Sequence, residues 1–307
     1  MHYLQKKVLY TIRKYELIKK GETIGVAVSG GKDSMTLLYI LNSVARERAL
    51  KIIAFIIDEG IKAKETTKEE AKIEGKSDKN TIIYTYRQKI LPEVRKFCKQ
   101  NQIQLVETSF KKYYGFDINS ILKKIKSLGI STCYACSLIK RPLLNEMVRK
   151  YKCDKVATGH SLDDEAETII LNLTKGSTQL LAKLGPIAGI LKEKKFVPRI
   201  KPLYLCLSKE IALYAKLKQL PHDLTTCPIR EDTLRVEIRN FLKKLEIEHP
   251  EIKQAIVNSY LQLMPLLKSQ FKSSVLKHCK ICEEPSSNEI CKRCIILKQI
   301  LGKKIKK

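Results

Sequence analysis

The sequence contains no tryptophan and only seven phenylalanines, so the interior must be built mainly from isoleucine, leucine and valine. It also lacks any apolar run near the roughly 20 residues that a membrane-spanning helix needs. Ile52–Ile57 is among its longest runs, and the first ten residues, MHYLQKKVLY, do not form the apolar core of a signal peptide. We therefore expect a cytoplasmic protein with no membrane partner.

Acidic residues are scarce relative to basic ones. The chain has 59 Lys and Arg against 32 Asp and Glu, which gives a formal net charge of +27 over 307 residues. Self-repulsion at this level opposes compaction and is typical of proteins that bind a polyanion. Nucleic acid is therefore the expected partner. Two alternatives are a lysine-rich genome or hot habitat, where acidic residues should rise as well, and an anionic membrane surface.

Ten cysteines are present, and in a chain of this kind they rarely form disulfides. Six of them make three C-x-x-C pairs, which indicate metal binding or thiol chemistry. We interpret Cys98, Cys153 and Cys206 as packing residues, and Cys227 lies alone before a proline.

Strand-like and helix-like segments alternate in the first two thirds of the chain. This alternation predicts an α/β fold with a parallel sheet covered by helices on both faces. From Ser208 onward the pattern is helical, at 208–219, 231–245 and 250–270. The predicted strands are Thr23–Val28, Lys51–Ile57, Gln102–Glu107 and Lys155–Thr158, with a short one at Ile82–Tyr86, and the predicted helices are 3–19, 33–46, 90–100, 117–128, 138–151 and 163–173.

A glycine-rich loop with the sequence SGGKDS joins the first strand to the following helix, at Ser29–Ser34. It is neither a Walker A loop, which would need glycine at Val26 and Ser or Thr in place of Asp33, nor a dinucleotide G-x-G-x-x-G motif. Gly30 and Gly31 allow backbone N–H groups to approach an anion, and a helix N-terminus adds unpaired donors. The loop therefore suits a pyrophosphate group.

This hexapeptide resembles the signature of the PP-loop ATP pyrophosphatase family, whose fold is similar to the adenine nucleotide alpha hydrolases. Further motifs resemble one branch of it, the tRNA 2-thiouridine synthetases of the archaeal and eukaryotic cytosolic type, related to the thermophile position-54 enzymes. These motifs are IDEGI at 57–61, CYACSLIKR at 133–141, ATGHSLDDEAET at 157–168, Cys227-Pro228, and CEEPSSNEICKRC at 282–294. Relatives in this branch often carry an N-terminal zinc module, whereas this sequence has no cysteine before Cys98.

With this resemblance, four parts are expected. They are an N-terminal basic helix at 1–22, a PP-loop ATP-binding catalytic domain at 23–207 with an insertion at 61–85, a helical extension at 208–274, and a four-cysteine zinc module with a basic tail at 275–307.

The resemblance implies that ATP and magnesium bind around the glycine loop. Asp33 and Asp164 are expected near the phosphates or the metal, with Asp163 as second choice, and Lys140 near the α-phosphate. His160 is expected either to contact phosphate or to cap its loop. The expected cofactor-binding residues are Ala27, Ser29, Gly30, Gly31, Lys32, Asp33, Ser34, Ile57, Asp58, Lys140, Gly159 and Asp164.

Cys133 and Cys136 are expected just before a helix, where the helix dipole and two basic neighbours, Lys140 and Arg141, should lower a thiol pKa. From the residues alone, this pair could be a redox dithiol or half of a metal site. The resemblance implies that Cys133, Cys136 and Cys227 hold a 4Fe-4S cluster with one open iron. The alternative is a persulfide on Cys136 or Cys227 without a cluster.

Four further cysteines, Cys279, Cys282, Cys291 and Cys294, have the spacing of a closed, structural zinc site with four thiolate ligands. Rubredoxin-like iron is the minor alternative. Basic residues around them are expected to contact RNA phosphates, although the last six residues could equally be a solvated tail. They are Lys272, Lys277, Lys280, Lys292, Arg293, Lys298, Lys303, Lys304, Lys306 and Lys307.

The function that follows from the resemblance is ATP-dependent tRNA 2-thiolation. The enzyme would adenylate the C2 carbonyl of a uridine, at position 34 or 54, release pyrophosphate, and replace the oxygen with sulfur. The sulfur donor would be a ubiquitin-like thiocarboxylate carrier or sulfide, and a homodimer is compatible with the resemblance. The rival hypotheses are a lysidine synthetase-like ligase, which has no use for the three cysteines, and a non-catalytic RNA-binding protein with a zinc knuckle.

Overall fold

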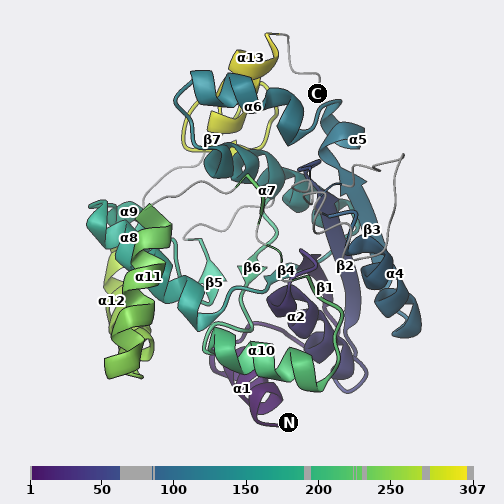
Figure 1. The fold of residues 1–307 in the computed structure, drawn as a ribbon, viewed down its shortest axis with the longest axis vertical. Helices are drawn as coiled ribbons and strands as arrows, with labels where there is room; N and C mark the ends of the chain where they lie inside the picture. Colours follow the sequence, from purple (N-terminus) through teal and green to yellow (C-terminus); the bar gives the residue numbers. More distant parts are fainter. Residues whose placement is uncertain are drawn as a thin grey trace, which may run out of the picture.

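A six-stranded sheet forms the centre of the computed structural model, which describes residues 2–62, 85, 87–189, 195–223, 225, 227–229, 234–271 and 277–302 (Figure 1). The strand order is β3-β2-β1-β4-β6-β5, and all neighbours are parallel except β5 and β6. The strands are β1 (Thr23–Val28), β2 (Lys51–Asp58), β3 (Gln104–Ser109), β4 (Lys155–Thr158), β5 (Ile187–Ala188) and β6 (Arg199–Ile200).

The order of the strands locates a binding site. The chain runs outward from β1 through β2 to β3 and then returns to place β4 on the other side of β1. In open α/β sheets, ligands bind at the carboxyl ends of the strands where the order reverses. Here that point lies between the ends of β1 and β4, at Ser29 and Gly159.

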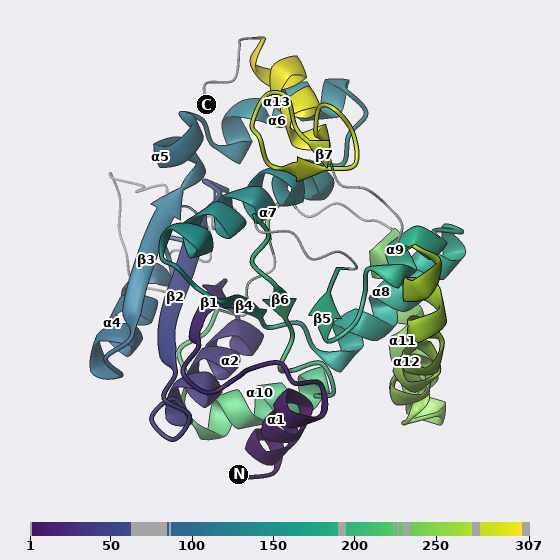
Figure 2. The ribbon, with the colours of Figure 1, turned by 180° about the vertical axis from the view of Figure 1, so that it is seen from behind.

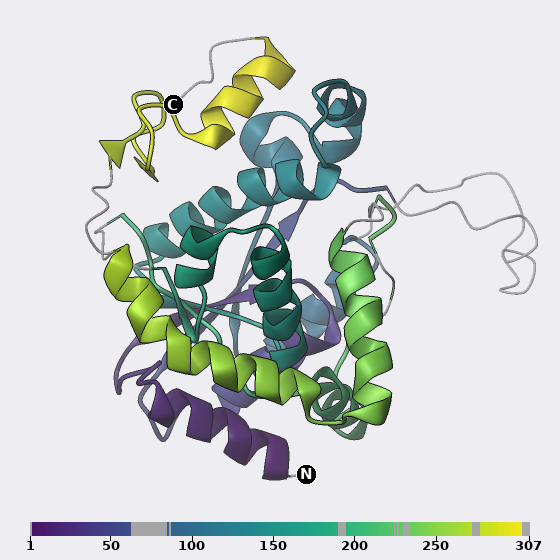
Figure 3. The same ribbon diagram turned by 90° about the vertical axis from the view of Figure 1, so that its left-hand side faces the viewer.

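Three hydrophobic cores surround the sheet. One face packs against α1 (His2–Lys14), α2 (Lys32–Ser43), α4 (Leu91–Gln100) and α10 (Ser208–Leu217). The other face packs against α5 (Phe110–Tyr114), α6 (Ile118–Ser127), α7 (Thr132–Lys150) and α13 (Lys292–Leu301), as Figure 2 shows from behind. The third core joins α8 (Leu162–Thr174), α9 (Thr178–Ala182), α11 (Leu234–Glu248) and α12 (Ile252–Gln270) beside the sheet (Figure 3).

The predicted α/β class is confirmed, and β2 shows why. Its side chains alternate between the two faces, with Ile52 and Ala54 in one core and Ile53, Phe55 and Ile57 in the other. A strand that is buried on both faces has no polar positions, which is why parallel strands appear as continuous apolar runs.

Some helices and strands begin or end at residues other than those predicted. The N-terminal helix ends at Lys14 rather than 19, because the backbone of Glu16 turns left-handed at φ 49°. The third strand begins two residues later than predicted, after Gln102, which has φ 54°. The largest difference is α7, which begins at Thr132 rather than 138. Its first turn consists of Thr, Cys and Tyr, which are weak helix formers, so its start was hidden in the sequence.

The segments after residue 207 are distributed over all three cores. α10 packs with α1 and α2, α11 and α12 pack on α8, and α13 packs on α6 and α7. The predicted insertion and the strand at Ile82–Tyr86 lie outside the described residues, apart from an isolated bridge between Lys62 and Thr85. Among the described residues, no helix is both long and apolar enough to cross a membrane.

Candidate active site

The glycine loop lies at the carboxyl end of β1 and leads directly into α2. Gly30 has φ 77°, and a Cβ there would lie 2.5 Å from a methyl carbon of Ile90, so only glycine fits. Gly31 is the N-cap of α2, and no side chain caps it. The first N–H groups of the helix therefore point into the site without side-chain acceptors, which is the arrangement that binds phosphate.

The two serines of the loop hold its shape. Ser34 is buried, and its hydroxyl accepts a hydrogen bond from the Ser29 backbone N–H (3.1 Å) and donates one to the Gly31 carbonyl (2.9 Å). The Ser29 and Ser34 hydroxyls also lie 3.1 Å apart. Lys32 turns aside to pair with Asp33 (2.7 Å) and to donate to the Ser208 hydroxyl (2.8 Å). The loop is therefore organised before any ligand arrives.

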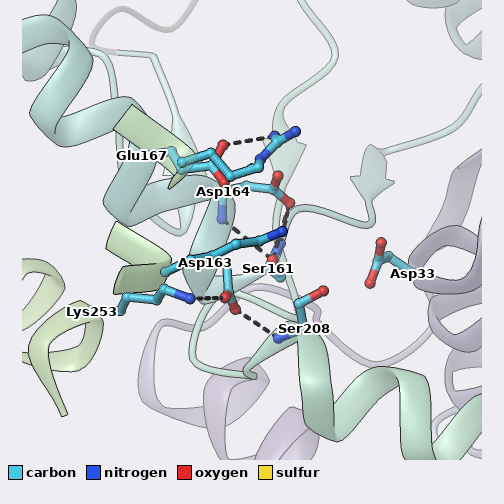
Figure 4. A pocket seen from close by; sticks show the side chains of 9 residues that line it. Asp33, Ser161, Asp163, Asp164, Glu167, Ser208 and Lys253 are labelled. Atoms are coloured by element: carbon cyan, nitrogen blue, oxygen red, sulfur yellow. Dashed lines mark hydrogen bonds and ion pairs between the residues drawn. The ribbon is translucent and has the colours of Figure 1, made fainter. Parts of the chain in front are cut away.

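A cavity of about 280 Å³, lined by both acidic and basic side chains, opens beside the loop (Figure 4). Asp33 stands on one side of it, and the start of α8, with Ser161, Asp163 and Asp164, forms the other. Burial raises the pKa of Asp33, and the nearby Asp164 raises it further, which indicates that the two carboxylates share one space. Paired carboxylates near phosphates are typical magnesium ligands, so these two fit the predicted ion.

Asp164 is a better candidate ligand than Asp163. Both oxygens of Asp163 are engaged, one with the Ser208 N–H (2.7 Å) and the other with Lys253 (2.7 Å). Asp164 forms a capping box with Ser161 through its Oδ2 alone, as far as the described residues show. Its other oxygen is therefore available, and the order of preference predicted from the sequence agrees with this geometry.

Gly159 has a structural reason of its own to be glycine. A Cβ there would lie 2.9 Å from both the carbonyl carbon of Asp33 and the backbone nitrogen of Ser34. The end of β4 therefore packs directly against the start of α2, and any side chain would push the two apart. His160 follows, and its Nδ1 lies 2.8 Å from the Thr158 hydroxyl, so this nitrogen caps the loop.

A second cavity, of about 210 Å³, is lined by all three cysteines of the predicted cluster, Cys133, Cys136 and Cys227. Cys133 and Cys136 lie in the first two turns of α7, not before a helix as predicted, and their spacing of three places them on one helix face. Cys227 reaches the same cavity from a distant part of the chain. Apart from the resemblance, nothing in the sequence indicated that Cys227 lies in the same cavity as Cys133 and Cys136.

The predicted lowering of a thiol pKa at the Cys133–Cys136 pair is wrong for Cys136. Burial raises the pKa of Cys136 to about 12 and also raises the pKa of Cys227. Lys140 lowers the pKa of Cys136, but not enough to offset burial. Ligation would overturn this balance, because a thiol that coordinates a metal is deprotonated outright.

Glu59 was not among the predicted site residues, although it belongs to the IDEGI motif. Its carboxylate is 2% exposed and accepts from Lys140 Nζ at 2.9 Å and Arg87 Nε at 3.1 Å. Although burial opposes its ionisation, the two cations lower the pKa of Glu59 to about 2. A buried charge requires such partners, so Glu59 fixes the position of both cations at the wall of the cysteine cavity.

Arg87 connects the glycine loop to the cysteine cavity. Its guanidinium donates to the backbone carbonyl of Ser29 in the glycine loop and also to Glu59 in the cysteine cavity. The phosphate loop and the three thiols are therefore joined by one arginine and one glutamate. Lys140 stands at this junction, with its charge balanced by Glu59.

The remaining predicted nucleotide contacts occupy the ends of the first two strands. Ala27 pairs with Thr158 and Phe55, and Ile57 is buried in the second core. Asp58 accepts hydrogen bonds from the Gly60 N–H (2.9 Å) and the Thr85 hydroxyl (2.9 Å), so it shapes the turn after β2.

The four C-terminal thiols form a much tighter group. Their sulfur atoms all lie within 4.8 Å of one another, and those of Cys282 and Cys291 are 3.7 Å apart. Sulfurs bound tetrahedrally to zinc at about 2.3 Å are separated by about 3.8 Å, so Cys279, Cys282, Cys291 and Cys294 fit this ion. Backbone N–H groups also donate to two of them, Cys279 and Cys291.

Cys133, Cys136 and Cys227 do not form such a tight group, although all three line one cavity. Their wider separation does not suit a single ion, whereas a cube of four irons joins more distant thiolates. The donor set of three cysteines around one cavity therefore fits an iron–sulfur cluster.

Other sequence predictions have mixed outcomes. Cys98, Cys153 and Cys206 are buried as packing residues, as predicted. Arg293 is directed to Tyr114 and Cys282 instead of solvent, which raises its pKa despite burial. Lys277, Lys280, Lys292 and Lys298 are exposed, whereas Lys272, Lys303, Lys304, Lys306 and Lys307 lie outside the described residues.

This phosphate loop at the switch point of a parallel sheet defines a PP-loop nucleotide-binding protein, and residues 2–108 match the family described as the PP-loop domain. The chain belongs to the PP-loop family that includes the tRNA 2-thiolation proteins. It is 31% identical to the tRNA-5-methyluridine(54) 2-sulfurtransferase of Pyrococcus horikoshii, over 95% of this chain and 84% of that one.

Two further relatives extend this similarity. The cytoplasmic tRNA 2-thiolation protein 1 of Anopheles gambiae is 31% identical over 94% of this chain and 77% of its own length. The solved structure of the U34-tRNA thiolase NcsA of Methanococcus maripaludis with its [4Fe-4S] cluster is 30% identical, with a TM-score of 0.76 over 97% of this chain and 87% of that one. The overall fold thus has a counterpart in a structure that contains the cluster.

Proposed function

We propose that this protein is an ATP-dependent tRNA-uridine 2-sulfurtransferase. The observation that carries the proposal is the bridge made by Arg87 and Glu59, which places a phosphate loop and a three-cysteine cavity side by side. A nucleotide-activating site next to a thiol-lined site is what replacement of a carbonyl oxygen by sulfur requires. Similarity to tRNA 2-thiolation proteins over nearly the whole chain supports tRNA as the substrate.

The chemistry has two steps. The C2 oxygen of uridine attacks the α-phosphate of ATP, and pyrophosphate leaves. A sulfur nucleophile then attacks C2, and AMP departs with the former carbonyl oxygen. Activation is needed because a carbonyl oxygen is a very poor leaving group, whereas AMP is a good one.

The chain's own residues have separate tasks in these steps. The N–H groups at the start of α2, at the end of the Ser29–Ser34 loop, bind the β- and γ-phosphates, and Asp33 and Asp164 would hold magnesium beside them. Lys140 offsets charge at the α-phosphate, and Glu59 keeps it in place. Cys133, Cys136 and Cys227 would hold the cluster, which would supply iron to bind the incoming sulfur. Zinc at Cys279, Cys282, Cys291 and Cys294 would be structural.

The cluster-free alternative uses a persulfide on Cys136 or Cys227. Burial favours the neutral thiol at both positions, which argues against a reactive free thiolate there. The sulfur source remains part of the proposal: a thiocarboxylate carrier or sulfide would reach the exposed Cys133 side of the cavity. We also propose that the chain can form a homodimer.

The test is reconstitution under anaerobic conditions with tRNA, ATP, magnesium and sulfide. We expect about four iron atoms and one zinc per chain, tRNA-dependent release of pyrophosphate, and 2-thiouridine detected by mass spectrometry. Mass spectrometry of RNase fragments assigns the thiolated uridine to position 34 or 54, the two positions named among the relatives. A triple Ser variant of the cluster cysteines that still thiolates tRNA would overturn the proposal. Lysine-dependent modification would instead indicate a lysidine synthetase-like ligase.

A further inference from the structure

Two arginines near the proposed active site have no counter-charge in the part of the chain that the structure describes. Arg141 on α7 and Arg199 on β6 make no hydrogen bond or ion pair with any described residue, and Nε of Arg199 is completely buried. Neighbouring arginines differ in this respect, since Arg235 and Arg239 both pair with Glu167. A half-buried guanidinium without an acceptor, as at Arg199, is costly, so its position needs an explanation.

The fold holds these two arginines next to each other. Asn145 of α7 donates to the Lys195 carbonyl (2.8 Å) and accepts from the Val197 N–H (3.0 Å), which ties the segment before β6 to the helix. Arg141 lies one turn before Asn145 on the same helix face. Arg199 lies two residues after Val197, where pairing with β4 has begun through the Pro198 carbonyl.

The pKa of Arg199 agrees with this placement. Burial, and then the charge of Arg141, lower the pKa of Arg199 to about 10. Both arginines also act electrostatically on His160, at the carboxyl end of β4. The pair therefore lies beside the switch point of the sheet, at the α7 side of the nucleotide site.

Two unpaired guanidiniums are a receptor for an anion. Arginine presents N–H groups in a planar fork that matches two oxygens of a phosphate, and two such forks bind one phosphate from two sides. Here Arg141 is exposed and Arg199 is half-buried, so an anion can approach from solvent. Without an anion the pair only destabilises the fold through mutual repulsion. An anionic ligand that binds during the reaction would offset this repulsion and would explain why both arginines are present.

We propose that Arg141 and Arg199 bind a backbone phosphate of the substrate RNA next to the reacting uridine. This inference rests on the proposed function. The phosphates of ATP already have the N–H groups at the start of α2. Arg141 lies about 7.5 Å along α7 from Cys136, at about 1.5 Å per residue, a distance within one nucleotide of the cavity in which C2 must react. A chain with a net charge of +27 also attracts RNA over long range.

The experiment measures binding of unmodified tRNA to the full chain as a function of salt concentration. The variants are Arg141→Met and Arg199→Met, which keep most of the side-chain volume and remove the charge. Arg46→Met is the matched control, because Arg46 is an exposed arginine past the far end of α2. Affinity for a non-hydrolysable ATP analogue and the thermal midpoint are measured on the same samples.

We expect each active-site variant to bind tRNA about tenfold more weakly at fixed salt and to lower the slope of log affinity against log salt by about one. ATP-analogue affinity should stay within about twofold. The thermal midpoint should stay level or rise, because a repulsion has been removed; the control should match the wild type throughout.

Three results would overturn the inference. Weaker ATP-analogue binding with an unchanged tRNA slope would assign the pair to the triphosphate. A lower thermal midpoint with an unchanged slope would mean that the arginines are structural, and no change in any measurement would mean that they bind no phosphate. Thiolation by the wild type is assayed in parallel: a wild type that binds tRNA with the full slope but forms no thiouridine refutes the proposed function and leaves the phosphate site standing.

Discussion

The molecule has two functional groups of thiols, and they differ in how closely the sulfur atoms are grouped and in how open each site is. The four cysteines of the C-terminal group lie within 4.8 Å of one another, and backbone N–H groups donate to two of them. The three cysteines of the active-site cavity are wider apart, border a hollow of about 210 Å³ and include one exposed thiol. A closed thiol site serves the fold, while an open site leaves room for a reactant.

The two groups are connected by α7. Its first turns carry Cys133 and Cys136, while its last turn carries Arg149, which pairs with Glu284 of the zinc module at 2.6 Å. α13, which carries the last zinc ligand, places Ile296, Leu297 and Ile300 in the same core as Leu143 and Val148 of α7. The structural site therefore supports the helix on which the open site is built.

The largest effect is expected from Cys136→Ser. Sulfur transfer should fall to undetectable levels, because the variant lacks one of the three thiolates that the open site requires. The thermal midpoint should hardly move, since the exchange is nearly isosteric in a partly exposed cavity. Thiouridine formation and calorimetry measure the two quantities. Cys98→Ser is a matched control that should keep activity, so a loss of activity in both variants would contradict a specific role for Cys136.

The next largest effect is expected from Cys279→Ser, and it should fall on stability rather than directly on sulfur transfer. Zinc binding in such modules is coupled to folding, so the variant should lose its zinc and the C-terminal module should unfold. Unfolding of the module would expose apolar side chains of the core around α7, which should lower the free energy of unfolding by about 3 kcal/mol or more. Zinc analysis and denaturant unfolding test this. A variant of unchanged stability would show that α13 packs without the metal.

Glu59→Gln should affect both stability and activity, because Glu59 is buried and also holds Lys140 and Arg87 at the open site. Removing its charge leaves Lys140 and Arg87 without their shared partner and should cost about 3 to 5 kcal/mol. In protein that remains folded, pyrophosphate release should fall, since Lys140 is no longer held in place. Wild-type activity at reduced stability would separate the structural role from the catalytic one.

The same carboxylate predicts a dependence of stability on pH. The pKa of Glu59 is about 2 in the folded protein against 4.5 in a free side chain. A lowered folded pKa stabilises the protein above the unfolded value, and this stability is lost as pH falls from about 4.5 to 2. The contribution is about 3 kcal/mol, at about 1.36 kcal/mol per unit. Unfolding curves of wild type and Glu59→Gln between about pH 6 and 3 should converge as pH falls; parallel curves would contradict this origin.

The smallest effect is expected from Arg149→Ala, which removes the ion pair between α7 and the zinc module. The pair is partly exposed, so the loss of unfolding free energy should be about 1 kcal/mol. Zinc content should be unchanged, and iron content should fall slightly if the module positions α7. Lys280→Ala is the control, because its pair with Glu289 is fully at the surface. Equal effects of both variants would mean that Arg149 has no special role.

Much of the fold could be predicted from the sequence because it is encoded locally. β1 and β4 have the predicted limits, since short β-branched runs bounded by Gly, Asp and Ser define them. The glycine loop was recognisable for the same reason, as Gly30 needs a backbone that only glycine adopts readily. The start of α7 was missed because packing, rather than intrinsic propensity, stabilises its first turn: Thr132 and Ala135 are completely buried.

The sequence by itself determined the kinds of group available: a phosphate loop, three C-x-x-C pairs, and a strong excess of positive charge. Only the tertiary structure decided which of them face one another. It joined Ser29 to the cysteine cavity through Arg87 and Glu59, buried Cys136 so that its thiol pKa rises, and set Arg141 beside Arg199. The physical reason is that burial and charge pairing depend on neighbours far along the chain, which local residue patterns do not encode.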